Sequence, residues 1–201
     1  MGLPPSRHRA PRHGQEPHPL TSLALPLEHT HVITEKTHKP MADWIEAGSP
    51  APAFTLAADD GTKVKLSDLK GSPVVLYFYP GDDTPGCTRE ACAFRDRKAE
   101  LQKLGAKVLG ISTDDVASHV KFRDKYSLNF PLLADPDHAV AEKYGAWREK
   151  NMYGKKSMGI ARSTFLIGPD GKVKKVWKAV KVDGHDEQVL AALRAMQEEG
   201  E

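Results

Sequence analysis

The chain of 201 residues contains two cysteines, Cys87 and Cys92, which stand five positions apart. A chain that keeps only two thiols, and keeps them this close together, is expected to use them jointly. A Cys-x-x-Cys pair would indicate a thioredoxin-like reductant, and two such pairs would indicate a zinc site. The spacing here is Cys-x4-Cys with no histidine nearby in the sequence, which offers too few ligands for zinc. We therefore expect thiolate chemistry without a metal.

The residues before Cys87 predict that its thiol lies in the first turn of a helix. A buried strand ends at Tyr79, and Thr84 is a favourable helix N-cap. Pro85 suits the first helical position, so Cys87 falls at the third. Unpaired backbone N–H groups and the positive end of the helix dipole stabilise a thiolate there. The alternative is an inert buried cysteine, which would explain neither the capped turn nor the second thiol.

Strands and helices alternate along residues 41–201, which predicts an α/β protein with a mixed central sheet flanked by helices. Strands are predicted from apolar and β-branched runs at 52–56, 63–66, 74–79, 107–112, 130–133, 164–167 and 173–177. Helices are predicted at 85–104, 115–126, 136–144 and 185–196. Gly105 is expected to end the first of these helices, and Asp114 to cap the second.

Composition narrows the possible functions of residues 41–201, which we interpret as one domain. The chain is 39% hydrophobic and 28% charged, as is usual for a globular protein. Beyond residue 40, acidic and basic residues are equal in number, which argues against a nucleic-acid or anionic-membrane surface. No stretch reaches the roughly 20 apolar residues of a membrane span. Two cysteines are too few for a secreted disulfide scaffold, so we expect a cytoplasmic protein.

Residues 1–40 differ from the rest of the chain. They hold seven of the 15 prolines and six of the nine histidines, without apolar periodicity. Such a segment cannot bury enough surface to fold, so a disordered N-terminal extension is predicted. The histidines lack the spacing of metal ligands. The run that opens at Met41 reads like a natural start, which favours a misassigned start codon for this extension.

The run from Pro80 to Cys87 resembles a known active-site motif. Pro80-x-x-x-Thr84-x-x-Cys87 resembles the motif of the peroxiredoxins, and Cys92 resembles the resolving cysteine of their Q-type subgroup, the bacterioferritin comigratory proteins. The resemblance covers roughly residues 44–196 and includes the segment that begins at Arg162. It implies a thioredoxin-like fold and the reduction of hydrogen peroxide or organic hydroperoxides without a bound cofactor.

The same resemblance implies a role for each residue of the motif. Cys87 would be the peroxidatic thiolate and would become a sulfenic acid, which condenses with Cys92 to a disulfide. Thioredoxin or a similar dithiol protein would reduce that disulfide. Thr84 would hydrogen-bond the peroxide, Pro80 would shield the sulfenic acid from water, and Arg162 would stabilise thiolate and peroxide. Because similar Q-type proteins are often monomeric, a monomer is expected.

The residues themselves also favour a cation near the thiol. Asp82 and Asp83 make the loop acidic, so a positive charge from elsewhere in the chain is needed to favour a thiolate. Arg162 is the candidate, and a surface charge in front of a strand is the alternative. Thr84 could likewise serve only as a helix cap.

Two other functions fit the same fold. A thiol–disulfide oxidoreductase resembles thioredoxin in carrying Cys-x-x-Cys and a proline before the Thr-Phe-Leu strand, but Ser163 occupies that position here. A redox sensor or chaperone, whose disulfide switches the binding of a partner, is compatible with the sequence as an added role. Consumption of peroxide, compared with reduction of insulin disulfides, separates the enzymes.

Overall fold

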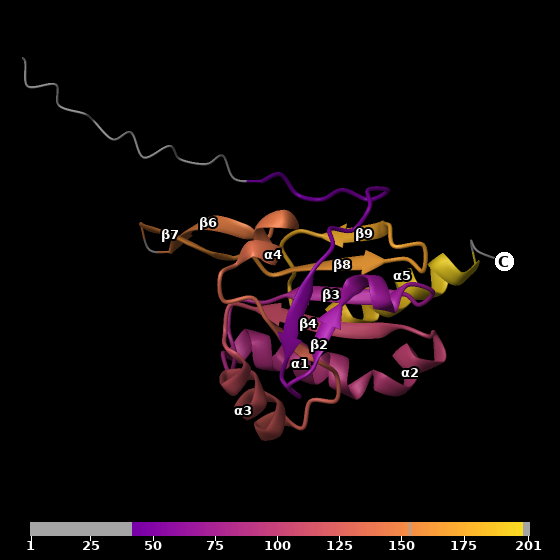
Figure 1. Ribbon diagram of the computed structural model, residues 1–201, viewed down its shortest axis with the longest axis horizontal. Helices are drawn as coiled ribbons and strands as arrows, with labels where there is room; N and C mark the ends of the chain where they lie inside the picture. The colour runs from indigo at the N-terminus through magenta and orange to yellow at the C-terminus, as the bar shows by residue number, and fades with distance from the viewer. Residues whose placement is uncertain (1–41, 153, 199–201) are drawn as a thin grey trace, which may run out of the picture. The chain divides into compact units, whose positions relative to one another are not determined.

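The computed structural model describes residues 42–152 and 154–198, so the prediction for residues 1–40 lies outside the described residues. A seven-stranded mixed sheet with the order β2-β1-β5-β4-β3-β8-β9 forms its centre (Figure 1). The three central strands, which run parallel, are β3 (Val74–Phe78), β4 (Lys107–Ser112) and β5 (Leu132–Ala134). The antiparallel strands are β1 (Thr55–Ala58), β2 (Lys63–Lys65), β8 (Ser163–Ile167) and β9 (Val173–Trp177).

Strand β3 shows how the sequence builds two cores. All five of its residues are buried, and their side chains alternate between the two faces of the sheet. Leu76 and Phe78 enter one core, whereas Val75 and Tyr77 enter the other. Because both faces are covered, the strand reads as a continuous apolar run.

Helices cover both faces of the sheet, which confirms the predicted α/β architecture. One core receives side chains from the longer helices α1 (Pro85–Asp96), α2 (Lys98–Lys103), α3 (Val116–Tyr126) and α5 (His185–Glu198). The other core is covered by the 3-10 helix η1 (Leu66–Leu69) and by α4 (Ala139–Lys143). The segment from Pro80 to Cys87 thus follows the central strand β3, where the chain enters α1.

The predicted helix 85–104 is wrong in one respect, because it consists of two helices. The first ends at Asp96 and α2 begins at Lys98, with Arg97 between them and without a glycine or proline at the junction. The Arg97 guanidinium bonds Asp186 at 2.8 Å and Glu187 at 3.0 Å on α5, so the junction is held by tertiary contacts. Gly105, with φ of +65°, does follow α2.

The predicted cap of α3 is displaced by one residue. The carboxylate of Asp115, rather than that of Asp114, accepts the Ser118 backbone N–H at 2.8 Å. Asp114 instead accepts hydrogen bonds from the Ser112 hydroxyl at 2.7 Å and from the Asp82 backbone at 2.9 Å. Its carboxylate therefore holds the loop that carries the motif.

The sequence missed a second, two-stranded sheet. Strands β6 (Trp147–Met152) and β7 (Lys155–Ile160) pair as an antiparallel hairpin, which lies at the left of Figure 1. Only the base, where Trp147 pairs with Ile160, packs against the core. The described residues of β7 are mostly exposed, so the apolar alternation that reveals a strand is absent.

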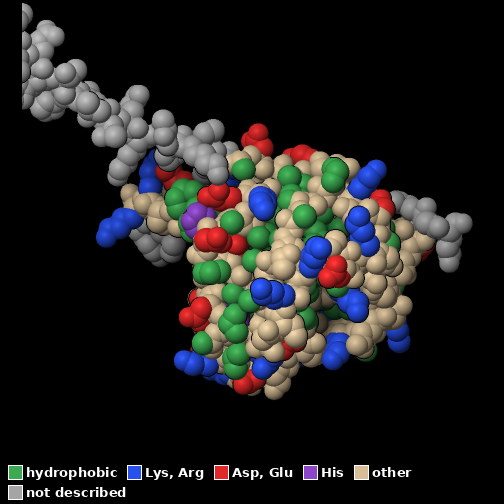
Figure 2. Space-filling model, viewed as in Figure 1, with side chains coloured by type: hydrophobic (Ala, Val, Ile, Leu, Met, Phe, Trp, Pro, Cys, Tyr) green, Lys and Arg blue, Asp and Glu red, His purple; other side chains and the backbone are tan. Residues whose placement is uncertain are grey.

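The surface mixes both signs of charge. Lys and Arg side chains lie interspersed with Asp and Glu side chains over the face seen in Figure 2. Among residues 42–152 and 154–198, no helix has the length and apolar character to cross a bilayer.

His185 opens α5 in an almost fully buried position. Its Nε2 lies 2.8 Å from the hydroxyl of Thr164, and its ring meets Phe94 and Trp177 edge to face. Burial lowers the pKa of His185 to about 4. A histidine whose folded pKa lies below its unfolded value of about 6.5 stabilises the fold above pH 6.5, and this stability is lost as the pH falls toward 4.

We therefore expect His185→Gln to flatten the pH dependence of stability. Between pH 7 and pH 4 the wild type should lose about 2–3 kcal/mol more unfolding free energy than the variant. Only the wild type has an imidazole at this position, and acid protonates that imidazole more readily in the unfolded chain than in the folded protein. Urea unfolding at several pH values measures this difference. Parallel curves for the two proteins would show that His185 carries no such penalty.

Candidate active site

The structure places Cys87 where the sequence predicts it. Thr84 occupies the N-cap with extended backbone angles, Pro85 is the first helical residue, and Cys87 is the third. The cysteine is 1% exposed and faces the core beneath α1. Its thiol therefore lies at the amino end of a 12-residue helix, where backbone N–H groups and the dipole favour negative charge.

The hydroxyl of Thr84 does not cap the helix, so the expectation that this side chain acts as a helix cap is wrong. It donates to the carbonyl oxygen of Gly81 at 3.2 Å, while the carbonyl of Thr84 accepts the Thr88 backbone N–H at 2.9 Å. No side chain caps α1. The first-turn N–H groups thus remain free of a side-chain acceptor, and the exposed hydroxyl of Thr84 stands at the entrance to the site.

Arg162 lies against the thiol, as predicted. It immediately precedes β8, and its Nη2 donates to the Cys87 sulfur at 3.3 Å. Its Nη1 donates to the carboxylate of Glu90 on α1. Gly86 makes room for the guanidinium, because a Cβ at that position would lie 3.0 Å from Nη2. The backbone carbonyl of Arg162 accepts the Val180 N–H at 3.1 Å, which holds the chain at this point.

Glu90 is a buried acid that the sequence analysis did not identify. It is 1% exposed, and one of its oxygens has no hydrogen-bond partner among the described residues. Burial raises the pKa of Glu90 to about 7, against the opposing effect of the Arg162 charge. Near neutral pH the carboxyl group of Glu90 can therefore be protonated or ionised. Arg162 binds both this group and the Cys87 thiol.

The two acids of the loop before α1, Asp82 and Asp83, contact side chains of α3 and do not contact Arg162. The carboxylate of Asp82 accepts hydrogen bonds from the hydroxyls of Tyr79 and Ser118, each at 2.8 Å. His119 Nδ1 lies 2.9 Å from the same carboxylate. These contacts turn the side chain of Asp82 toward α3.

Asp83 is held in the same way. Its backbone adopts a positive φ of 54°, which is uncommon for a residue other than glycine. Its carboxylate accepts hydrogen bonds from Lys125 at 2.6 Å and from the hydroxyl of Tyr126. The loop therefore presents Pro80 and Thr84 as exposed residues while both of its acids are occupied by α3.

Cys92 lies on the same helix as Cys87 and is half-buried, and both thiols are free. Residues five apart on an α-helix differ by about 140° in direction and by about 7.5 Å in rise, so their Cα atoms are about 8.7 Å apart. A disulfide requires Cα atoms roughly 4.4–6.8 Å apart. The two thiols therefore cannot bond while α1 is intact.

Residues 47–176 match the AhpC/TSA family. The chain belongs to this family. It is 48% identical to peroxiredoxin Bcp of Bacillus subtilis over 154 residues, which cover 77% of this chain and 98% of the relative. It is 47% identical to peroxiredoxin Bcp of Escherichia coli K12 over 150 residues, or 75% and 96% of the two chains. The chain is thus a peroxiredoxin, a thiol-dependent peroxidase.

Solved structures show the same relationship and confirm the thioredoxin-like fold. Peroxiredoxin Q of Xanthomonas campestris superposes with a TM-score of 0.68 at 47% identity, covering 71% of this chain and 90% of that one. The bacterioferritin comigratory protein of the same organism, studied for alkyl peroxide reduction, superposes with a TM-score of 0.71 at 44% identity, covering 75% and 99%.

In this peroxiredoxin the structure brings Cys87 and Arg162 together and places Thr84 and Pro80 on the adjoining loop. Glu90 could have been found from the sequence. It lies on the same helix face as the apolar residues Ala91 and Phe94, which are buried. An acid on a buried helix face is expected to pair with a basic side chain.

The fit between Gly86 and Arg162 provides a test that changes no charge. In Gly86→Ala the new methyl group should push Nη2 away from the Cys87 sulfur, so we expect the rate of reaction with peroxide to fall about tenfold, the cost of roughly one charge-assisted hydrogen bond. Stopped-flow measurement of the first turnover gives this rate.

Gly81→Ala is the matched control. A Cβ at Gly81 would lie 3.6 Å from Asp114, which is an ordinary contact, so this variant should react at close to the wild-type rate. Equal rates for the two variants would mean that the position of the guanidinium does not limit the reaction.

Proposed function

We propose that this peroxiredoxin reduces hydrogen peroxide and organic hydroperoxides through a sulfenic acid at Cys87 and a disulfide with Cys92. The observation that carries the proposal is the 3.3 Å contact between Arg162 Nη2 and the Cys87 sulfur in the first turn of α1. A guanidinium and a helix amino end both favour the thiolate, which is the nucleophilic form of cysteine.

In the first step, the Cys87 thiolate attacks one oxygen of the peroxide. A sulfur–oxygen bond forms and the O–O bond breaks, which leaves Cys87 as a sulfenic acid and releases hydroxide or alkoxide. The leaving group takes up, through solvent, the proton that the thiol lost on ionising, which gives water or an alcohol. The hydroxyl of Thr84 would turn from the Gly81 carbonyl to hydrogen-bond the peroxide. Arg162 would stabilise the negative charge during the transfer.

In the second step, the sulfenic acid condenses with the thiol of Cys92, which forms a disulfide and releases water. Pro80 would shield the sulfenic acid from bulk water before that reaction. Because the two Cα atoms are about 8.7 Å apart on an intact helix, the turns between Thr84 and Cys92 must unwind first. A dithiol protein of the thioredoxin type would then reduce the disulfide by exchange.

The organic branch of the substrate class is supported by the X. campestris relative, whose structures were studied for alkyl peroxide reduction. A monomer suffices for this cycle, because both thiols belong to one helix of one chain. We place the protein in the cytoplasm, since a reducing compartment keeps both thiols reduced between turnovers.

The two cysteines test this cycle separately. Cys87→Ser should abolish peroxide reduction, because the remaining thiol, Cys92, lies in the middle of α1 and lacks the helix amino end that activates Cys87. Cys92→Ser should react once with peroxide, fail to turn over with thioredoxin, and progress more readily to sulfinic acid, since no neighbouring thiol traps the sulfenate. Coupled peroxidase assays and intact-mass spectrometry follow the two outcomes.

Multiple turnover by Cys87→Ser would end this mechanism. Reduction of insulin disulfides at a rate that exceeds peroxide consumption in the wild type would instead favour a thiol–disulfide oxidoreductase.

A further inference from the structure

Lys150 is a half-buried lysine on β6 to which the cycle above assigns no role. In the hairpin register it pairs with Ser157 on β7. Its side chain nevertheless lies along the neighbouring position, because its Cε and Nζ are 3.6 Å from where a Cβ on Gly159 would be. The ammonium therefore points from the tip of the hairpin back toward its base.

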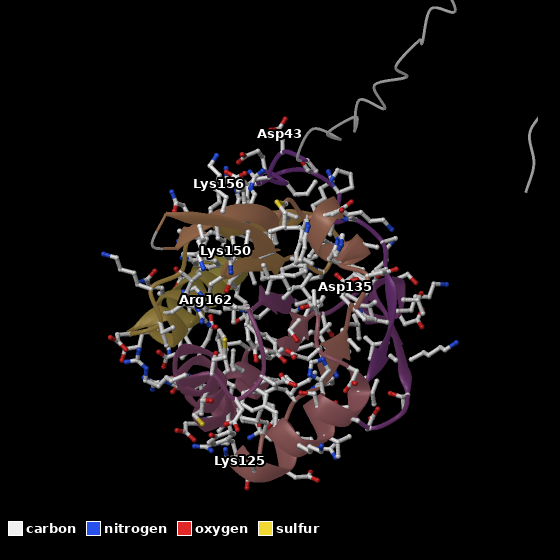
Figure 3. All side chains as sticks on the ribbon, turned by 90° about the vertical axis from the view of Figure 1, so that its left-hand side faces the viewer. Asp43, Lys125, Asp135, Lys150, Lys156 and Arg162 are labelled. Atoms are coloured by element: carbon white, nitrogen blue, oxygen red, sulfur yellow. The ribbon has the colours of Figure 1, made fainter. Side chains whose placement is uncertain are left out.

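The base of the hairpin leads directly to the active site. β7 ends at Ile160, and Arg162 follows two positions later. In the view of Figure 3, Lys150 and Arg162 are labelled near one another. Burial lowers the pKa of Lys150, the Arg162 charge lowers it further, and the sulfur of Cys87 opposes both effects. Arg162 in turn donates to the Cys87 sulfur at 3.3 Å, so the path from the hairpin to the thiol runs through this guanidinium.

Lys150 has no acidic partner of its own. In the described part of the chain, no carboxylate forms a hydrogen bond or ion pair with it, whereas Lys156 on the same hairpin pairs with Glu149 at 3.0 Å. The buried carboxylate of Glu90, on the same helix as the thiol, is already bound by Arg162. Placing a partly desolvated ammonium beside a guanidinium costs free energy, and negative charge on Cys87 offsets that cost.

We propose that Lys150 is a further electrostatic residue of the peroxidase site, whose ammonium stabilises the Cys87 thiolate alongside Arg162. The inference rests on the proposed function, in which Cys87 is the reacting thiol. The charged and titratable groups that face this thiol are Arg162 in front of β8, Glu90 on α1, Tyr77 on β3 and Lys150 on β6.

The charges of these four groups predict which reactants the site favours. The proposed set joins two cations to one thiol, and burial raises the pKa of Glu90, the acid bound by Arg162, to about 7. When Glu90 is protonated, the site carries an excess of positive charge beyond that of the thiolate. Lys150 should therefore favour negatively charged reactants over neutral ones, and this effect should weaken at high salt.

Alkylation of Cys87 in a Cys92→Ser background tests the inference, because that protein has a single thiol. Rates with neutral iodoacetamide and anionic iodoacetate are measured from pH 5 to pH 9 in the parent, Lys150→Gln, Lys150→Arg and Lys156→Gln. The last is the matched control, because it removes the same charge from an exposed, Glu149-paired position of the hairpin.

We expect Lys150→Gln to slow iodoacetamide about three- to tenfold at pH 6, which is the size of one charge interaction across a partly screened site. The loss should shrink as the pH is raised toward 9, and it should be larger with anionic iodoacetate than with neutral iodoacetamide. Lys150→Arg should retain the parent rates. The ratio of the two rates does not depend on how much protein is folded.

Two results would overturn the role of Lys150: rates for Lys150→Gln equal to those of Lys156→Gln, or a loss that is the same for both reagents at every pH. The proposed function is judged independently, by whether the parent protein consumes one equivalent of peroxide. Alkylation does not depend on that reaction, so the two ideas fail separately.

Discussion

The chemistry of this peroxiredoxin depends on a conflict of geometry within one helix. Cys87 needs α1 to be formed, because the first turn supplies the backbone N–H groups that favour its thiolate. The proposed Cys87–Cys92 disulfide needs the same helix to be broken, because a separation of five helical residues places the Cα atoms about 8.7 Å apart. The site is therefore a two-state element whose reduced and oxidised forms favour different backbones.

The surrounding contacts limit where that change can occur. On the amino side, Asp82 and Asp83 are bound by α3, so the loop has a fixed point that does not depend on α1. On the carboxyl side, Phe94 is buried and Arg97 is bound to α5. The segment free to unwind is the one between these anchors. Unwinding it would also withdraw Glu90 from Arg162, which releases a buried ion pair together with the helix.

The sequence predicted the parts of the site that local chemistry determines. Pro85 and the position of Cys87 in the first turn follow from helix-capping preferences, and the burial of β3 follows from its continuous apolar run. Arg162, which lies far from the motif in the sequence, was predicted from the family resemblance and from the need for a cation, and the structure brings it to the thiol.

The features that were missed depend on tertiary contacts, on a choice between local hydrogen-bond partners, or on strands that are largely exposed. The break at Arg97 arises from ion pairs with α5, which no local signal announces. The Thr84 hydroxyl bonds Gly81 in place of the helix, a choice between two nearby partners that propensity does not decide. The β6–β7 hairpin is polar and largely exposed, so its strands lack the alternation that marks a buried face. That hairpin carries Lys150, the residue proposed here as a second cation of the site.

Hydrogen exchange along α1 tests the helix switch most directly. Amide exchange is followed by mass spectrometry in the reduced protein and in the disulfide form, after the Cys87–Cys92 bond has been confirmed by peptide mapping. We expect residues 86–94 to exchange faster in the disulfide form, while α5 keeps the same protection in both forms. Equal protection of residues 86–94 in the two forms, with the bond confirmed, would contradict the switch.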